Sequence, residues 1–121
     1  MKRKALPHEG LVSWLKFFDI DYLDNSVCNQ LSELDINSPS DRAAAIRLAI
    51  RPEFESLNEI SKSSMLQVLS SALTASDSEL APLFERISMP FQSEVVDRRQ
   101  LLNSIWEVIG GVEPMSKNGN A

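Results

Sequence analysis

Apolar residues recur every three or four positions along most of the chain, a spacing that is typical of α-helices. No segment alternates strictly between apolar and polar residues as a half-buried strand does, and tyrosine and threonine are scarce. The first stripe predicts a helix over 9–18, and the next predicts a helix over 25–34 with Asp24 as its N-cap. The residues that form these two stripes are Leu11, Trp14, Leu15, Phe18, Val27, Leu31 and Leu34.

Serine and proline mark the boundaries of the next two helices. Ser38 fits an N-cap and Pro39 fits the first helical position, so a helix is predicted from there. We expect it to stop near Arg51, because a proline disfavours helical conformation in the residue before it. That proline, Pro52, then opens a short helix. Its apolar residues are Phe54, Leu57 and Ile60.

Three further helices are expected in the second half of the chain. One begins at Ser61 and carries apolar residues as far as Leu73. The next begins at residues 76–79, whose sequence Ser-Asp-Ser-Glu is a capping box. A last helix is predicted over 91–109 and should end at the glycine pair 110–111.

Six or seven short helices with short connections predict an all-α protein. Such links favour antiparallel neighbours, so we expect a compact single-domain array or bundle over residues 5–112, followed by a mobile tail over 113–121. A helical solenoid is the less favoured alternative, because no segment repeats at a fixed period. With 121 residues, 43% of them hydrophobic and 24% charged, the chain is long and apolar enough for one core.

The compartment can be predicted from the cysteine content and the first residues. Cys28 is the only cysteine, so no intramolecular disulfide can form, and a lone thiol favours a reducing compartment. The basic residues 2–4 resemble the start of a signal peptide, but residues 7–9 (Pro-His-Glu) interrupt the apolar region that such a peptide needs. No stretch approaches the ~20 apolar residues of a membrane span. We therefore expect a cytoplasmic protein that does not bind membranes.

The charge balance is acidic and argues against direct binding of nucleic acid. The net charge is −5, with 12 basic and 17 acidic residues. Three of the basic residues lie at positions 2–4, so the rest of the chain carries nine against 17, a net charge of −8. A protein that binds DNA or RNA normally has the opposite sign. A basic protein is the partner that this balance favours.

The most unusual feature of the chain is a block of acidic residues between positions 19 and 41. No lysine or arginine lies within it, and its first part interleaves acidic with aromatic residues. Clustered carboxylates steer a basic partner, and aromatic side chains beside them can anchor the interface. We therefore predict that this region binds a protein. The predicted partner-binding residues are Trp14, Phe17, Phe18, Asp19, Asp21, Tyr22, Asp24, Glu33 and Asp35.

The acidic block also fits roles that involve no partner. Aspartates such as Asp41 are common at helix N-termini and in solvated loops, so capping alone can explain them. For Trp14, the ordinary role is to anchor the core. The spacing Asp19-x-Asp21 resembles the start of an EF-hand loop. That pattern then fails, because Asp24 stands where the loop needs glycine and Gln30 stands where it needs glutamate. No metal site is expected.

The sequence lacks the residue patterns that are typical of enzyme active sites. His8 is the only histidine and is expected on the surface, while Cys28 is expected to be a structural thiol without a base. The sequence contains neither a glycine-rich phosphate loop nor a Gly-x-Ser-x-Gly elbow, so no cofactor is predicted. Arg42, Arg47 and Arg51 are expected to be surface salt-bridge partners.

These observations predict a non-enzymatic protein that binds another protein. The most concrete hypothesis is an acidic inhibitor of the immunity type, a monomer that neutralises a basic toxin in a 1:1 complex. A nuclease fits this role because it must be basic to hold phosphates. Two alternatives are an adaptor or regulatory subunit of a larger assembly, and a small enzyme that uses carboxylates alone.

Overall fold

The computed structural model of the protein describes residues 8–109, and in that range the chain is helical and contains no β-strand. The predicted all-α fold is therefore confirmed. The outer ends of the predicted domain, the glycine stop at 110–111 and the predicted mobile tail lie outside the described residues. The elements are η1 (Glu9–Leu11), α1 (Val12–Leu15), η2 (Lys16–Phe18), α2 (Asn25–Leu31), α3 (Pro39–Ala45), η3 (Ile46–Ile50), α4 (Arg51–Glu55), α5 (Glu59–Ala72), α6 (Asp77–Phe84) and α7 (Arg98–Ile109).

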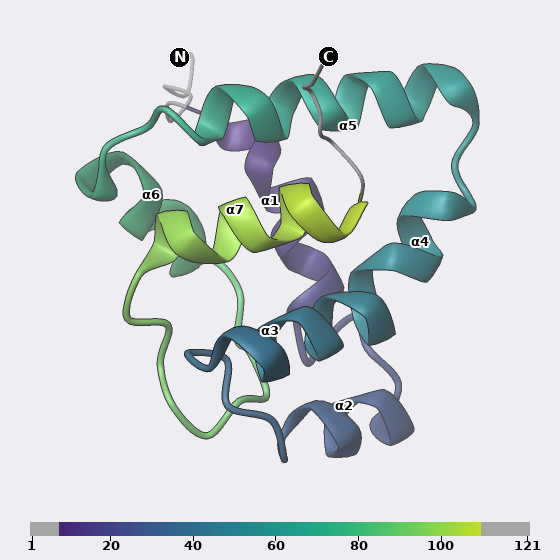
Figure 1. Ribbon diagram of the computed structural model, residues 1–121, viewed down its shortest axis with the longest axis vertical. Helices are drawn as coiled ribbons and strands as arrows, with labels where there is room; N and C mark the ends of the chain where they lie inside the picture. The colour runs from purple at the N-terminus through teal and green to yellow at the C-terminus, as the bar shows by residue number, and fades with distance from the viewer. Residues whose placement is uncertain (1–7, 110–121) are drawn as a thin grey trace, which may run out of the picture.

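The helices are arranged around α7, which crosses the middle of the molecule (Figure 1). Helix α5 lies at one end and α2 at the opposite end, while α3 lies between α7 and α2. Helix α7 contacts α3, η3, α4, α5 and α6, so it joins the two halves of the chain. None of the described helices is long and apolar enough to cross a membrane.

The first helical segment supplies the largest side chains of the core. Trp14 is fully buried, stacks on Phe54 with ring centroids 5.4 Å apart, and donates a 2.8 Å hydrogen bond from Nε1 to the carbonyl of Met65. Phe18 is also fully buried and meets Phe91 edge to face at 5.2 Å. These contacts join residues 9–18 to α4, to α5 and to the segment before α7.

Local start signals place several elements where the sequence predicts them. Helical structure runs from Glu9 to Phe18, with 3-10 turns at both ends. Asp24 caps α2, its side chain accepting the Val27 N–H at 2.9 Å. The capping box of α6 is present, with Ser76 and Glu79 bonded to each other's backbone N–H groups. In each case the signal is satisfied within a few residues of itself.

The helix predicted to stop near Arg51 instead continues through Pro52. The segment η3 is a π-helix, in which the Arg51 N–H bonds to the carbonyl of Ile46, five residues back. A proline in a regular α-helix would clash with the carbonyl four residues earlier, here that of Leu48. The wider π-turn directly before α4 changes the register of the bonds there, and Pro52 lies in the first turn of α4. The predicted stop was therefore wrong.

The last helix begins at Arg98 and not at residue 91, so the prediction was wrong for seven residues. Residues 91–97 are not helical, and three hydrogen bonds join Gln92, Glu94 and Val96 to the chain after α2. The Asn37 side chain donates to the Glu94 carbonyl at 2.9 Å and accepts the Val96 N–H at 2.9 Å. Asp97 then accepts the Gln100 N–H at 3.0 Å, as an N-cap does.

Two other boundaries differ by a few residues. Helix α2 ends at Leu31, three residues before the predicted end. Helix α5 begins at Glu59, two residues before the predicted start, because the Asn58 side chain accepts the Ser61 N–H at 2.8 Å and so caps it. Ile60, assigned to the preceding helix in the sequence, lies in the first turn of α5 and is exposed.

Arg42 is the one charged side chain in the core of the described residues, with 5% of its surface exposed. Its Nε donates to Ser104 Oγ at 2.8 Å, and its Nη1 donates to the Ile36 carbonyl at 3.3 Å. The prediction of a surface salt bridge was wrong for this residue, whereas Arg51 does pair with Glu55 at 3.0 Å. Arg42 instead joins α3 to α7 and to the loop after α2.

Candidate functional site

The structure divides the predicted partner-binding residues between the core and the surface. Trp14 and Phe18 are fully buried, and Phe17 is 5% exposed. These three aromatic side chains are therefore core residues: Trp14 and Phe18 expose no surface to a partner, and Phe17 exposes almost none. Tyr22 is the aromatic residue of the predicted set that reaches the surface, with 47% of its area exposed.

Residues 19–24 form a tight turn between η2 and α2, which we call the acidic turn. The Asp19 carbonyl accepts the N–H groups of Tyr22 and Leu23 at 2.9 and 3.0 Å, and the Asp19 side chain accepts the Asp21 N–H at 3.0 Å. The Ile20 N–H bonds to the Ser88 carbonyl at 2.8 Å. The turn is thus held both internally and against the loop after α6, although Ile20 is 46% exposed.

A hydrogen bond joins the acidic turn to α4. The Tyr22 hydroxyl donates to Glu53 Oε1 at 2.9 Å, and Lys16 Nζ lies 5.4 Å from the centroid of the Tyr22 ring. The bond to Glu53, together with burial and the negative charge of that carboxylate, raises the pKa of Tyr22 above its ordinary value. No pattern in the sequence assigns Glu53 to this surface, because it lies 31 positions away from Tyr22.

A cavity of about 400 Å³ opens between the acidic turn, the start of α2 and the helical run η3–α4. Its apolar lining comprises Leu23, Val27, Leu48, Ala49 and Pro52. Its polar lining comprises Tyr22, Asp24 and Glu53. One oxygen of each carboxylate is engaged, since Asp24 Oδ1 caps α2 and Glu53 Oε1 accepts the Tyr22 hydroxyl. The second oxygen of each has no hydrogen-bond partner among residues 8–109.

The other predicted acidic residues lie beyond the far end of α2, which spans about 10 Å at 1.5 Å per residue. Asp41 accepts the Asp35 N–H at 2.9 Å, and Asp35 accepts the Asn37 N–H at 3.0 Å. Glu33 is exposed. The acidic block is therefore two separate groups, one before α2 and one after it, and only the first adjoins the cavity.

Capping explains part of the acidic block but not its lack of basic partners. Asp19, Asp24, Asp35 and Asp41 each accept a nearby backbone N–H, as the capping alternative requires. The ion pairs of the described region lie elsewhere, and Arg86–Glu9 and Arg98–Asp77 are the shortest of them. Within residues 8–109 no acidic residue of the block has a basic nitrogen within 4.0 Å.

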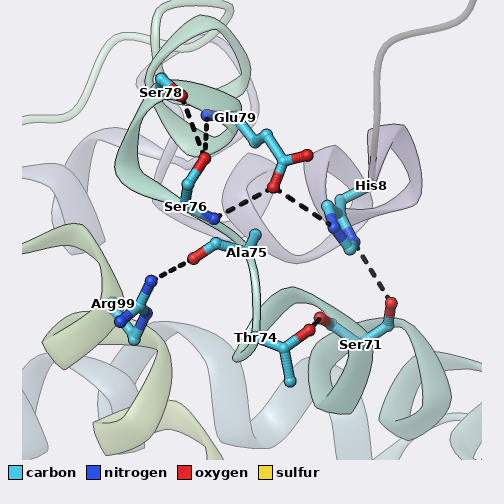
Figure 2. A network of polar contacts seen from close by, with 8 residues as sticks. All are labelled: His8, Ser71, Thr74, Ala75, Ser76, Ser78, Glu79 and Arg99. Atoms are coloured by element: carbon cyan, nitrogen blue, oxygen red, sulfur yellow. Dashed lines mark hydrogen bonds and ion pairs between the residues drawn. The ribbon is translucent and has the colours of Figure 1, made fainter.

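A second polar site surrounds His8 and was not found from the sequence (Figure 2). His8 Nδ1 lies 3.2 Å from Ser71 Oγ, and His8 Nε2 lies 4.0 Å from Glu79 Oε1. His8 is also the one non-glycine residue in the described range with positive φ, at 59°. The capping box locates Glu79, but no sequence spacing places a histidine from the chain terminus beside it.

Ser71, His8 and Glu79 are arranged in the order of a serine–histidine–carboxylate catalytic triad, but two observations argue for a structural role. The distance of 4.0 Å between His8 and Glu79 is too long for a hydrogen bond. Ser71 lies in the last turn of α5, where backbone carbonyls concentrate negative charge and would oppose a developing oxyanion. We interpret the network as a clamp that holds residue 8 against α5 and α6.

Among residues 8–109, no group of three histidine, cysteine, aspartate or glutamate side chains is placed to hold a metal ion. Cys28 is half-buried in α2. Compared with known proteins, the chain matches no family model, and no curated protein or solved structure is significantly similar to it.

Proposed function

We propose that the protein is a non-enzymatic binding domain that holds a basic protein on its acidic turn. One observation carries the proposal: the turn combines exposed Ile20 and Tyr22 with three carboxylates that have no ion-pair partner in the described range. These are the carboxylates of Asp19, Asp21 and Asp24. Exposed apolar side chains supply the contact area of an interface, and the carboxylates around them select a basic partner.

The hydrogen bonding of the acidic turn supports the proposal. Its backbone is bonded to Ser88, and its Tyr22 side chain is bonded to Glu53. A surface that is ordered before binding loses little conformational entropy on binding. The turn therefore suits a preformed interface better than a loop that folds onto its partner.

A basic toxin of the nuclease type is the partner that we favour. A nuclease needs positive charge to hold phosphates, and an acidic protein that covers this surface would exclude the substrate. Opposite charges also raise association rates, which benefits an inhibitor of a toxic enzyme. In this hypothesis the protein is an immunity-type inhibitor that acts as a monomer in a 1:1 complex.

An adaptor in a larger assembly is the second candidate, because the surface offers another place for a partner. An open groove of about 650 Å³ lies along α5, and its apolar lining includes Phe54, Leu66 and Trp106. An adaptor needs two contact surfaces, whereas an inhibitor needs one. Loss of partner binding on substitution in the groove as well as in the acidic turn would favour the adaptor.

The test is to isolate the partner with the purified protein and then measure its activity. Proteins captured from a lysate of the native cells would be identified by mass spectrometry, purified, and assayed for nuclease activity with increasing amounts of this protein. Inhibition that is complete at one equivalent is the expected result. A partner that is acidic, or a nuclease that binds but stays fully active, would contradict the inhibitor proposal.

A further inference from the structure

We propose that the cavity beside the acidic turn is a pocket for a single arginine side chain of the protein partner. This inference rests on the protein-binding function proposed above and names the group that the surface would recognise. The cavity, of about 400 Å³, lies within the ~300–1,000 Å³ range of ligand pockets. It exists in the isolated chain, so no rearrangement is needed to form it.

The lining of the cavity matches the two parts of an arginine side chain. Leu23, Val27 and Leu48 line it with apolar groups, against which the methylene stem can pack. Asp24 and Glu53 supply negative charge from two separate elements, the N-cap of α2 and the first turn of α4. Two carboxylates for a charged head and an apolar wall for a stem are the features that a long basic side chain requires.

The hydrogen-bonding capacity favours arginine over lysine. Asp24 Oδ2 and Glu53 Oε2 lack partners in the described range, so one acceptor remains on each carboxylate. A guanidinium presents five donors in a planar fork and can bond to two carboxylates at once. An ammonium is a point charge with a stronger hydration shell, and it loses more solvation on entering the same space.

The Tyr22 ring can add a cation–π contact. Lys16 Nζ already lies 5.4 Å from the ring centroid, so the ring accepts a positive charge in the folded protein. Lys16 also lies 5.8 Å from the Phe17 ring and is itself exposed. An incoming guanidinium would either stack on the other face of Tyr22 or displace the Lys16 ammonium from the ring.

The experiment uses the full chain and a blocked peptide, acetyl-Gly-Arg-Gly-amide, followed by amide NMR spectra. We expect saturable shifts at Tyr22, Leu23, Val27 and Ala49. The matched peptide with citrulline in place of arginine keeps the shape but removes the charge, and it should leave these signals in place. Equal shifts with citrulline, or arginine shifts that fall outside the cavity, would overturn the proposal. A lysine peptide that binds as tightly would overturn the preference for arginine.

Three charge-neutralising variants locate the effect. Glu53→Gln keeps an acceptor for the Tyr22 hydroxyl, and Asp24→Asn keeps an N-cap, so both should fold normally, as circular dichroism would check. Each should weaken binding of the arginine peptide by about threefold to tenfold, the value of one ordinary hydrogen bond, because solvent at this partly exposed site screens the charge. Glu107→Gln removes the same charge at an exposed position on α7 that does not line the cavity, and it should have no effect. An equal loss with Glu107→Gln would mean non-specific attraction and would refute the pocket.

The pocket and the proposed function can fail separately. If the isolated basic partner binds Glu53→Gln as tightly as the natural chain but loses affinity when Asp19 and Asp21 are neutralised, the function stands and the pocket is refuted. If the arginine peptide fills the cavity but no captured partner is inhibited, the pocket stands and the inhibitor function is refuted.

Discussion

The hydroxyl of Tyr22 donates a 2.9 Å hydrogen bond to Glu53, so the acidic turn is fastened to α4 across 31 positions of sequence. The bond joins an aromatic ring and a carboxylate that both line the cavity. It also places the charge of Glu53 beside the acidic turn, although Glu53 lies outside the acidic block in the sequence. The surface that we propose for binding is therefore a product of the fold.

This contact predicts an unusual titration of Tyr22, the only tyrosine in the chain. The hydrogen bond to Glu53 is the main cause that raises its pKa, followed by burial and the charge of Glu53. In the folded protein, the increase in tyrosinate absorbance should therefore have its midpoint above pH 10, the ordinary pKa of tyrosine. Glu53→Ala should return the titration toward that value, and a midpoint that does not change in this variant would contradict the assignment.

The same shift predicts how stability depends on pH. The folded protein holds the Tyr22 proton more tightly than the unfolded chain, because the pKa is raised on folding. This contribution to stability is fully present below pH ~10 and is lost as the pH rises through the raised pKa. Urea denaturation at increasing alkaline pH should show a steeper loss of stability for the natural chain than for Tyr22→Phe. An identical dependence of the unfolding free energy on pH in the two proteins would show that the Tyr22–Glu53 bond does not contribute to stability.

Burial of Trp14 predicts a loss of stability without a loss of binding. Trp14→Phe removes the 2.8 Å bond to the Met65 carbonyl and leaves a gap beside Phe54. We expect the free energy of unfolding in urea to fall by about 1–3 kcal/mol, while the folded variant binds the partner normally. Trp106→Phe, at a half-buried site on α7, is the control and should cost less than about 1 kcal/mol. A binding defect in folded Trp14→Phe would contradict this prediction and show that Trp14 contributes to partner binding.

Sequence periodicity could predict that Trp14 and Phe18 lie on an apolar stripe, but not which surface covers that stripe. A stripe that faces the core and one that faces a partner have the same spacing. Local signals did better, because Asp24 and the box at 76–79 satisfy backbone groups within three residues. The segment 91–97 could not be predicted, since its bonds to Asn37 join residues 57 and 59 positions apart.

The same distinction applies to the candidate site. Tyr22, Asp24 and the lack of lysine and arginine at positions 19–41 can be read from the sequence, because they belong to one continuous segment. Glu53 and the apolar wall of the cavity come from η3 and α4, and only tertiary packing brings them there. The His8 network was hidden for the same reason, since Ser71 lies 63 positions away from His8.

The two roles of Glu79 can be separated by substitution. Its side chain accepts the Ser76 N–H at 3.0 Å in the capping box and lies 4.0 Å from His8 (Figure 2). Glu79→Ala removes both contacts but leaves Ser76 as the N-cap, so it should lower the free energy of unfolding by about 0.5–1.5 kcal/mol, the usual net value of one hydrogen bond. Glu79→Gln keeps an acceptor for the cap, so its effect should be smaller. Equal losses in the two variants would assign the stabilisation to the charge near His8.

The acidic turn makes a kinetic prediction that separates an interface from a solvated loop. Asp19→Asn, Asp21→Asn and Asp24→Asn together remove three charges but keep side-chain oxygens for the turn and the cap, so stability should change little. Association with the basic partner should slow by about threefold or more at low salt and become less sensitive to salt, because electrostatic steering acts mainly on the association rate.

A matched control keeps this result specific to the turn. Glu59→Gln, Glu85→Gln and Glu107→Gln change the net charge by the same amount at exposed positions on α5, after α6 and on α7. Measured by surface plasmon resonance across a range of salt concentrations, the control should associate almost as fast as the natural chain. If both triple variants slow association equally, attraction arises from the overall charge and the turn has no special role. If neither does, the carboxylates of the turn serve only to cap and solvate it, as the capping alternative holds.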